Sequence, residues 1–178
     1  MIELTRAGRW DVPAIRWIYR RSFPRSERKP FSTITRMARE GTADLWAIRR
    51  KGKLLGFAST VNSPELILLD YFAVTKSCRG QGVGSAALRA FLSQYPDKGI
   101  FVEIESTSEA SVNHGERESR KKFYVNCGLT PMGTEADVFG VRMELLGRDC
   151  YLDFADYQHF YREHYNPWAA EHIREVTL

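Results

Sequence analysis

Residues 71–92, YFAVTKSCRGQGVGSAALRAFL, read as the end of a strand, a glycine-rich turn and a helix. Apolar residues such as Val83, Ala87 and Leu88 recur along one side of the helix, as an amphipathic helix requires. The apolar strand IFVEIE follows at residues 100–105. The unit is therefore a strand–helix–strand crossover with a glycine-rich turn at its first corner.

The glycine-rich turn RGQGVGS (residues 79–85) has the chemistry of an anion-binding site. Glycine lets the backbone turn tightly and lets a ligand approach the amides, and the first helical turn adds unpaired N–H donors. A Walker loop would need a lysine after Gly84, and a Rossmann turn would need glycine where Ser85 stands. The turn therefore indicates a pyrophosphate site of another kind.

The rest of the chain predicts an α+β fold. Before the crossover, residues 12–40 hold two amphipathic helices, and residues 44–74 read as an antiparallel meander. After it come a helix near residues 117–126 and two strands between residues 129 and 146. We expect a central mixed, mostly antiparallel sheet of about six to seven strands flanked by helices, with a helical C-terminal extension.

Composition is that of an ordinary globular domain, with 178 residues, 43% hydrophobic and 27% charged. No segment approaches the about 20 consecutive apolar residues of a membrane helix, so no membrane partner is expected. Three scattered cysteines predict free thiols and, with an N-terminus unlike a secretory signal, a cytoplasmic location. The first 40 residues hold ten Lys and Arg against four Asp and Glu, a patch that could attract a polyanion or be a solvated helix face.

Residues 71–92 resemble the acetyl-CoA motif of the GCN5-related N-acetyltransferase (GNAT) family, and RKKFYVNCGL (residues 120–129) resembles a later helix of that family. The order of predicted elements also matches from residue 1 to about residue 147. The resemblance implies an acetyltransferase domain at residues 1–147 and a helical extension at residues 148–178 packed on it. It implies acetyl-CoA as cofactor and transfer of an acetyl group directly to a primary amine of a small molecule or peptide.

The resemblance also implies where the cofactor binds. Backbone amides of the glycine-rich turn would hold the pyrophosphate, and the pantetheine arm would pair with the preceding strand. The cofactor-binding residues implied are Phe72, Ala73, Val74, Arg79, Gly80, Gln81, Gly82, Val83, Gly84 and Ser85. The amide of Ala73 or Val74 is the expected donor to the developing oxyanion.

Acetyl transfer to an amine calls for a proton acceptor, because alkyl ammonium groups have pKa values near 10. Glu103 and Glu105 lie two apart on one predicted strand and therefore face the same side of the sheet. Glu103 matches the acidic strand position that is the general base in some GNAT relatives. Glu105, a water relay and Asp70 stay open as alternatives, as does a role in attracting a cationic substrate.

Tyr124 matches a tyrosine of the GNAT family. The resemblance implies that its hydroxyl is the general acid for the leaving thiolate, and the alternative is that Tyr124 is a core aromatic. Relatives often carry asparagine seven residues before this tyrosine and alanine four before it. Here those positions are Arg117 and Arg120, so the chain departs from the family pattern at the asparagine that would contact the cofactor.

Cys78 lies near the glycine-rich turn and is expected to be a packing residue rather than a nucleophile. The four histidines show no ligand-like spacing, so no metal is expected. Phe154, Tyr157, Tyr161 and Tyr165 follow helical spacing and should pack on the domain, although the stripe could instead form a homodimer interface.

A different class of function is a non-catalytic module that senses CoA or binds nucleic acid through the basic N-terminal helices. Those helices lack the interleaved aromatic residues of a single-strand platform, so nucleic acid is not the expected partner.

Overall fold

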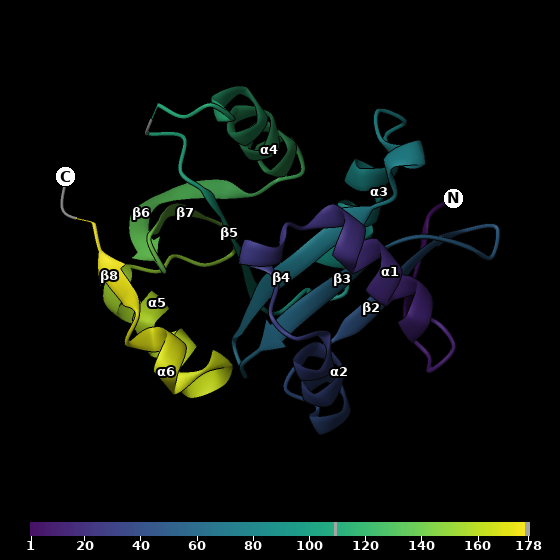
Figure 1. Cartoon of the computed structure of the whole chain (residues 1–178), viewed down its shortest axis with the longest axis horizontal. Helices are drawn as coiled ribbons and strands as arrows, with labels where there is room; N and C mark the ends of the chain where they lie inside the picture. Colours follow the sequence, from purple (N-terminus) through teal and green to yellow (C-terminus); the bar gives the residue numbers. More distant parts are fainter. Residues whose placement is uncertain (109, 177–178) are drawn as a thin grey trace. The chain divides into compact units, whose positions relative to one another are not determined.

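The computed structural model describes residues 1–108 and 110–176, in which strands and helices alternate along the chain (Figure 1). The strands are β1 (Glu3–Arg6), β2 (Leu45–Arg50), β3 (Lys53–Asn62), β4 (Leu66–Val74), β5 (Gly99–Glu105), β6 (Thr130–Val138), β7 (Val141–Arg148) and β8 (Ile173–Glu175). The helices are α1 (Val12–Ser22), α2 (Phe31–Glu40), α3 (Val83–Leu92), α4 (His114–Asn126), α5 (Phe154–Phe160) and α6 (Pro167–Ala170).

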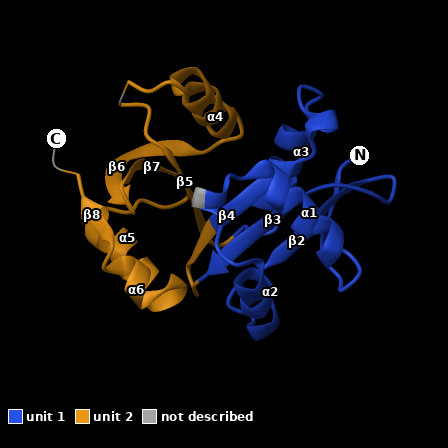
Figure 2. Ribbon diagram, viewed as in Figure 1, with its two compact units in different colours: residues 1–62, 69–96 blue, residues 63–68, 97–178 orange. Residues whose placement is uncertain are grey.

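The chain forms two compact units (Figure 2). Unit 1 comprises residues 1–62 and 69–96, and unit 2 comprises residues 63–68 and 97–178. The sheet order is β1-β2-β3-β4-β5-β7-β6-β8, and β4 contributes residues to both units. Pairing is parallel between β4 and β5, and it is antiparallel for β1–β2, β2–β3, β5–β7, β6–β7 and β6–β8. The predicted mixed, mostly antiparallel α+β fold is confirmed.

One strand was not expected. The C-terminal tail continues after α6 into β8, where Ile173 pairs with Val138 at the end of β6. The Ile173 side chain is 2% exposed. Three residues carry too little alternation to predict a strand, and the pairing forms because it buries this side chain against β6.

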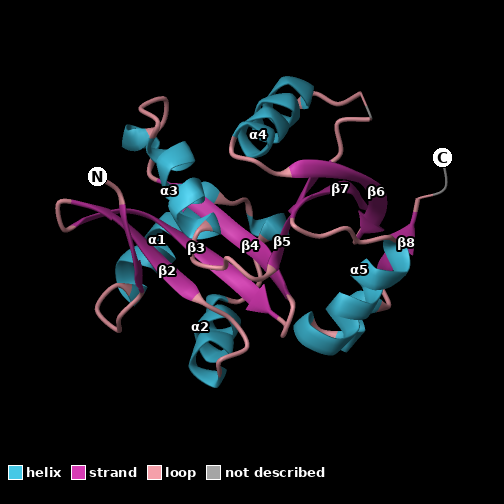
Figure 3. Cartoon of the chain, turned by 180° about the vertical axis from the view of Figure 1, so that it is seen from behind, coloured by secondary structure: helices cyan, strands magenta, loops and turns pink. Residues whose placement is uncertain are grey.

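Unit 1 buries the two faces of its strands under different helices, as Figures 1 and 3 show from opposite sides. Leu45 belongs to an apolar cluster with residues of α1 and α2, whereas its neighbour Trp46 donates a hydrogen bond to the Tyr95 hydroxyl at 3.0 Å. Phe91 of α3 packs on the same Tyr95, with ring centroids 5.3 Å apart. Successive strand residues point to opposite faces, so α1 and α2 cover one face and α3 the other.

Unit 2 packs helix α5 on β5. The Phe101 ring makes edge-to-face contacts with Tyr157 and Phe160 of α5, at centroid distances of 6.4 and 5.0 Å. Aromatic pairs of this kind add about 0.5–1.5 kcal/mol to the burial of their surface. The strand that carries Glu103 is therefore covered by α5.

None of the helices in the described part of the chain combines the length and apolar character needed to cross a membrane.

Candidate active site

The glycine-rich turn at residues 79–85 lies in unit 1, and its backbone conformation favours glycine. Gly80 has a φ of 71°, and Gly82, which precedes α3, has a φ of 72°; a side chain in this left-handed region is strained. A Cβ built on either glycine would meet no atom within 4 Å, so the space beside each is open. The helical bond from Ala86 N to Gly82 O, 3.0 Å long, leaves the amides of Val83–Ser85 without partners inside the helix.

Side chains brace this turn from within. Gln81 Nε2 donates a hydrogen bond to Ser77 O at 2.8 Å, and the Thr75 hydroxyl donates to Cys78 Sγ at 3.3 Å. Arg79 is exposed at the start of the turn, so a cation accompanies the helical amides. These bonds hold the segment in one conformation, and a preformed loop loses less entropy when a ligand binds.

The predicted pantetheine stretch, Phe72–Val74, forms the C-terminal end of β4. One edge of it lies against β3, because Thr75 N donates to Leu55 O at 2.7 Å. A Cβ on Gly56 would lie 2.2 Å from Ala73 O, so only glycine permits this close approach of the two backbones. β3 thus fixes the position of the stretch within unit 1.

Glu103 lies on β5 in unit 2 and accepts a hydrogen bond from the Tyr157 hydroxyl at 2.8 Å. Burial, and then the charge of Glu103, raise the pKa values of Tyr157 and Tyr161 well above their ordinary value. Both hydroxyls therefore stay protonated at neutral pH. Tyr157 is held as a neutral donor to a carboxylate oxygen.

The two competing carboxylates are held by cations instead. Glu105 accepts hydrogen bonds from Arg117 Nη2 at 3.0 Å and from Arg120 Nη1 at 3.2 Å. Asp70 pairs with Lys29 at 2.5 Å in unit 1. The two arginines found where relatives often carry asparagine and alanine thus have a structural role, because they tie α4 to β5.

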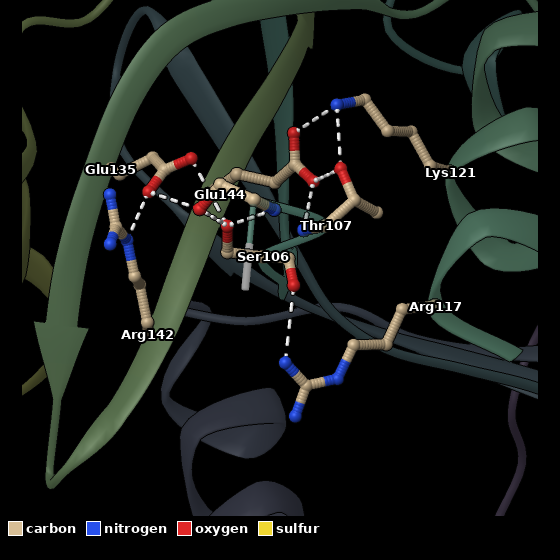
Figure 4. A network of polar contacts seen from close by, with 8 residues as sticks. Ser106, Thr107, Arg117, Lys121, Glu135, Arg142 and Glu144 are labelled. Carbon is tan, nitrogen blue, oxygen red and sulfur yellow. Dashed lines mark hydrogen bonds and ion pairs between the residues drawn. The ribbon is translucent and has the colours of Figure 1, made fainter. Parts of the chain in front are cut away.

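Figure 4 shows a network that holds the segment after β5 and helix α4 against β6 and β7. Glu144, 6% exposed, pairs with Lys121 Nζ at 2.6 Å and accepts bonds from Thr107 N and Oγ1 at 2.9 and 2.8 Å. The Ser106 hydroxyl donates to Glu135 Oε1 at 3.0 Å. A buried carboxylate is stable only with such partners, so the network fixes the helix that carries Tyr124.

Tyr124 lies half-buried on α4, with its ring centroid 5.1 Å from that of Phe123. Burial raises the pKa of Tyr124 to about 12, an effect that the nearby Arg120 partly opposes. The hydroxyl therefore stays protonated at neutral pH and has a proton to donate. Arg120, one helical turn earlier, reaches Glu105, which links α4 directly to the strand of Glu103.

Tyr157 and Tyr161 both interact with Glu103, whereas their spacing in the sequence predicts only an aromatic stripe. The stripe does pack within its own unit, through Tyr157 on Phe101. A signal was present, because buried tyrosines usually find a hydrogen-bond partner for the hydroxyl. What the pattern did not show is that this partner is Glu103, 54 residues away.

The raised tyrosine pKa values predict a loss of stability at alkaline pH. Above about pH 10 the unfolded chain releases tyrosine protons that the native state keeps, so the unfolding free energy falls as pH rises. Each such tyrosine contributes about 1.4 kcal/mol per pH unit in that range. Urea unfolding at pH 7, 9, 10 and 11 should show constant stability up to pH 9 and a steep fall beyond pH 10. The double variant Tyr157→Phe, Tyr161→Phe should fall less steeply, and an unchanged slope would contradict the assignment.

The sequence matches the model of the acetyltransferase (GNAT) family over residues 12–127. No curated protein sequence matches the chain at a significant level. Similar solved structures include a GNAT-family acetyltransferase from Bacteroides thetaiotaomicron, with a TM-score of 0.73, 20% identity and coverage of 90% of this chain and 97% of that one.

Two further structures show the same fold. A spermidine N-acetyltransferase chimera from Vibrio cholerae has a TM-score of 0.63 at 11% identity, with coverage of 82% of this chain and 94% of that one. A ribosomal L7/L12 alpha-N-protein acetyltransferase in complex with coenzyme A has a TM-score of 0.62 at 14% identity, with coverage of 83% of this chain and 93% of that one.

The fold and the family match are those of an acetyltransferase, and the match covers well over half of the chain. The chain belongs to the GNAT family of acetyltransferases. It is an N-acetyltransferase that uses acetyl-CoA. The amides of Val83–Ser85, which have no partner inside the helix, and the open space beside Gly80 and Gly82 fit the pyrophosphate of that cofactor.

Proposed function

We propose that Glu103 is the general base and Tyr124 the general acid in acetyl transfer to a primary amine of a small molecule or peptide. The observation that carries the choice of base is the set of partners around the three candidate carboxylates. Glu103 accepts a hydrogen bond from the neutral hydroxyl of Tyr157, whereas cations neutralise Glu105 and Asp70. Both oxygens of Glu105 accept bonds from arginines and Asp70 is held by Lys29, so these two carboxylates are less available to contact a substrate amine.

Bound acetyl-CoA supplies the activated thioester. In this proposal Arg79, Gly80 and the amides of Gln81–Ser85 hold its pyrophosphate, and Phe72–Val74 pairs with the pantetheine arm along the edge of β4 that faces away from β3. The amide of Ala73 or Val74 donates to the carbonyl oxygen as negative charge develops. Glu103, directly or through one water, takes a proton from the amine, and the Tyr124 hydroxyl gives one to the departing sulfur.

Replacing Glu103 tests the assignment of the base. Glu103→Gln should lower kcat/KM by about tenfold or more and flatten the low-pH limb of its pH profile, because the variant has no carboxylate to titrate. The affinity for CoA, measured by calorimetry, should change little. Glu105→Gln is the matched control, since it removes the same charge two residues away on the same strand. If that variant alone flattens the limb, Glu103 is not the base.

The acceptor class can be found by a direct screen. Purified protein with acetyl-CoA is incubated with a polyamine, an aminoglycoside, a peptide with a free N-terminus and a peptide with an internal lysine, and released thiol is measured. We expect one class to exceed the others by at least about tenfold in kcat/KM, since binding energy from the rest of the acceptor contributes to rate. Thiol release with none of the four would contradict transfer to a primary amine.

Three further proposals concern the setting of the enzyme. A cytoplasmic location is supported by the three free cysteines, and cell fractionation tests it. We place the acetyltransferase domain at residues 1–147 and an extension at residues 148–178 packed on it. The contact of the Phe160 ring with Phe101 supports the packing, and the stability of expressed residues 1–147 tests the division. A homodimer is supported by the exposed Phe139 and Trp168 rings, stacked 5.6 Å apart, and light scattering on Trp168→Ala tests it.

A further inference from the structure

Unit 1 contains a cavity of about 690 Å³ formed by α1, the loop that follows it and the first turn of α2. A volume of this size is typical of small-molecule sites. The residues that line the cavity are Val12, Arg16, Tyr19, Arg20, Arg25, Arg28, Lys29, Pro30, Phe31, Ser32 and Thr35. All belong to the described part of the chain, five of them are cationic and none is acidic. The cavity shares no residue with the glycine-rich turn.

Four of the five cations, the arginines, have no carboxylate partner within the described residues. Arg28 Nε is also buried without a hydrogen-bond partner there. Other arginines of unit 1 behave differently, since Arg36 pairs with Glu40 at 2.8 Å and Arg49 pairs with Asp11. Several unpaired guanidinium groups around one cavity repel one another, and an unsatisfied buried donor carries a further cost. An anion bound in the cavity would reduce the repulsion between the guanidinium groups and would accept a hydrogen bond from the buried donor.

Buried tyrosines below the cavity hold its loop in place. The Tyr71 hydroxyl donates to Glu27 O at 2.9 Å and accepts from Lys29 N at 3.3 Å, while the Tyr19 hydroxyl donates to Lys29 O at 2.9 Å. The Lys29 ammonium pairs with Asp70 at 2.5 Å, so this cation is anchored to β4. Between the two anchored residues lies Arg28, whose guanidinium is thereby positioned at the cavity. The loop is arranged for a ligand before binding, which lowers the entropy lost on binding.

The chemistry of the lining selects phosphate groups. The planar guanidinium offers paired N–H donors that match phosphate oxygens, and four such groups balance a diphosphate better than a single carboxylate. The hydroxyls of Ser32 and Thr35 lie at the N-terminal turn of α2, where the helix dipole also favours an anion. A polynucleotide would instead need a cationic groove with exposed stacking rings, and here the cations converge on one concavity while Tyr19 is 2% exposed.

We propose that this cavity binds the multiply charged phosphate group of a small molecule, at a site separate from the one that holds acetyl-CoA. The site does not depend on the roles proposed for Glu103 and Tyr124. The phosphate could be a free anion such as pyrophosphate or part of an ester such as a nucleoside diphosphate.

The test is calorimetry on the full chain, first saturated with CoA so that the glycine-rich turn is filled. Inorganic pyrophosphate should then bind with a stoichiometry of one per chain. Arg20→Gln and Arg25→Gln, at exposed positions where folding is not at risk, should each weaken binding by at least about tenfold. Arg39→Gln removes the same charge from the exposed end of α2 outside the cavity, and it should change the affinity by less than about twofold.

Parallel titrations identify the source of the phosphate and separate the two sites. If ADP binds more tightly than pyrophosphate, the ligand is a phosphate ester. If pyrophosphate binds more tightly, the ligand is a free anion, and either result supports the proposal. Gly82→Leu should lose CoA binding yet keep pyrophosphate binding, whereas Arg20→Gln should do the opposite. No pyrophosphate binding to the CoA-saturated protein, an equal loss in Arg39→Gln, or binding of a single-stranded oligonucleotide but not of pyrophosphate would each overturn the proposal.

Discussion

Gly82→Leu is expected to weaken CoA binding by at least about 100-fold while the protein stays folded. The backbone at Gly82 has a φ of 72°, and the space beside it is open to solvent in the protein itself, so a leucine there meets the ligand rather than the core. Its side chain would block the approach of a pyrophosphate to the amides of Val83–Ser85. Loss of two charge-assisted hydrogen bonds, each worth about 1.5–3 kcal/mol, corresponds to a 100-fold change or more.

Gly41→Leu is the matched control for this variant. Gly41 follows α2 with a φ of 77°, and a Cβ there also meets no atom within 4 Å. Leucine in this position therefore carries the same backbone strain of about 1–2 kcal/mol without lying at the glycine-rich turn. Isothermal calorimetry with CoA and circular dichroism on both variants separate the two effects. Undiminished CoA binding by Gly82→Leu would remove the turn from the cofactor site.

Tyr124→Phe is expected to lower kcat by about 100-fold or more while CoA affinity stays the same. The variant keeps the ring that packs 5.1 Å from Phe123 and removes only the hydroxyl, whose pKa of about 12 keeps its proton available at neutral pH. A loss of this size is what general acid catalysis contributes. Since the proton is retained well above neutral pH, wild-type kcat should show no loss of this acid below about pH 11.

A merely structural tyrosine would behave in the opposite way. Removal of a buried hydroxyl would then cost about 1 kcal/mol of stability and leave the chemistry nearly intact. Steady-state rates and thermal unfolding on the same preparation decide between the roles. A Tyr124→Phe enzyme that is less stable but fully active would exclude Tyr124 from the mechanism.

The glycine-rich turn and the crossover around it could be predicted because their signals are local. The left-handed backbone at Gly80 and Gly82 requires glycine, and the helical and strand periods around them are visible within a few residues. The same reasoning predicted helix α4 and the position of Tyr124 on it. Strand alternation also placed Glu103 and Glu105 on the same face of the sheet. Because it treats the two residues alike, it left the choice of base open.

Tertiary structure decided what local pattern could not, because the deciding contacts join residues far apart in the chain. Glu105 is neutralised by arginines of α4, and Glu103 is met by a tyrosine of the C-terminal extension. The basic excess of the first 40 residues could be read as a solvated helix face or as a polyanion site. It forms a cavity because Tyr71, more than 40 residues along the chain, holds the loop at Glu27 and Lys29. The number of basic residues can be counted in the sequence. Whether their side chains meet around one cavity depends on how the chain folds, here on the backbone groups that the buried Tyr71 hydroxyl contacts.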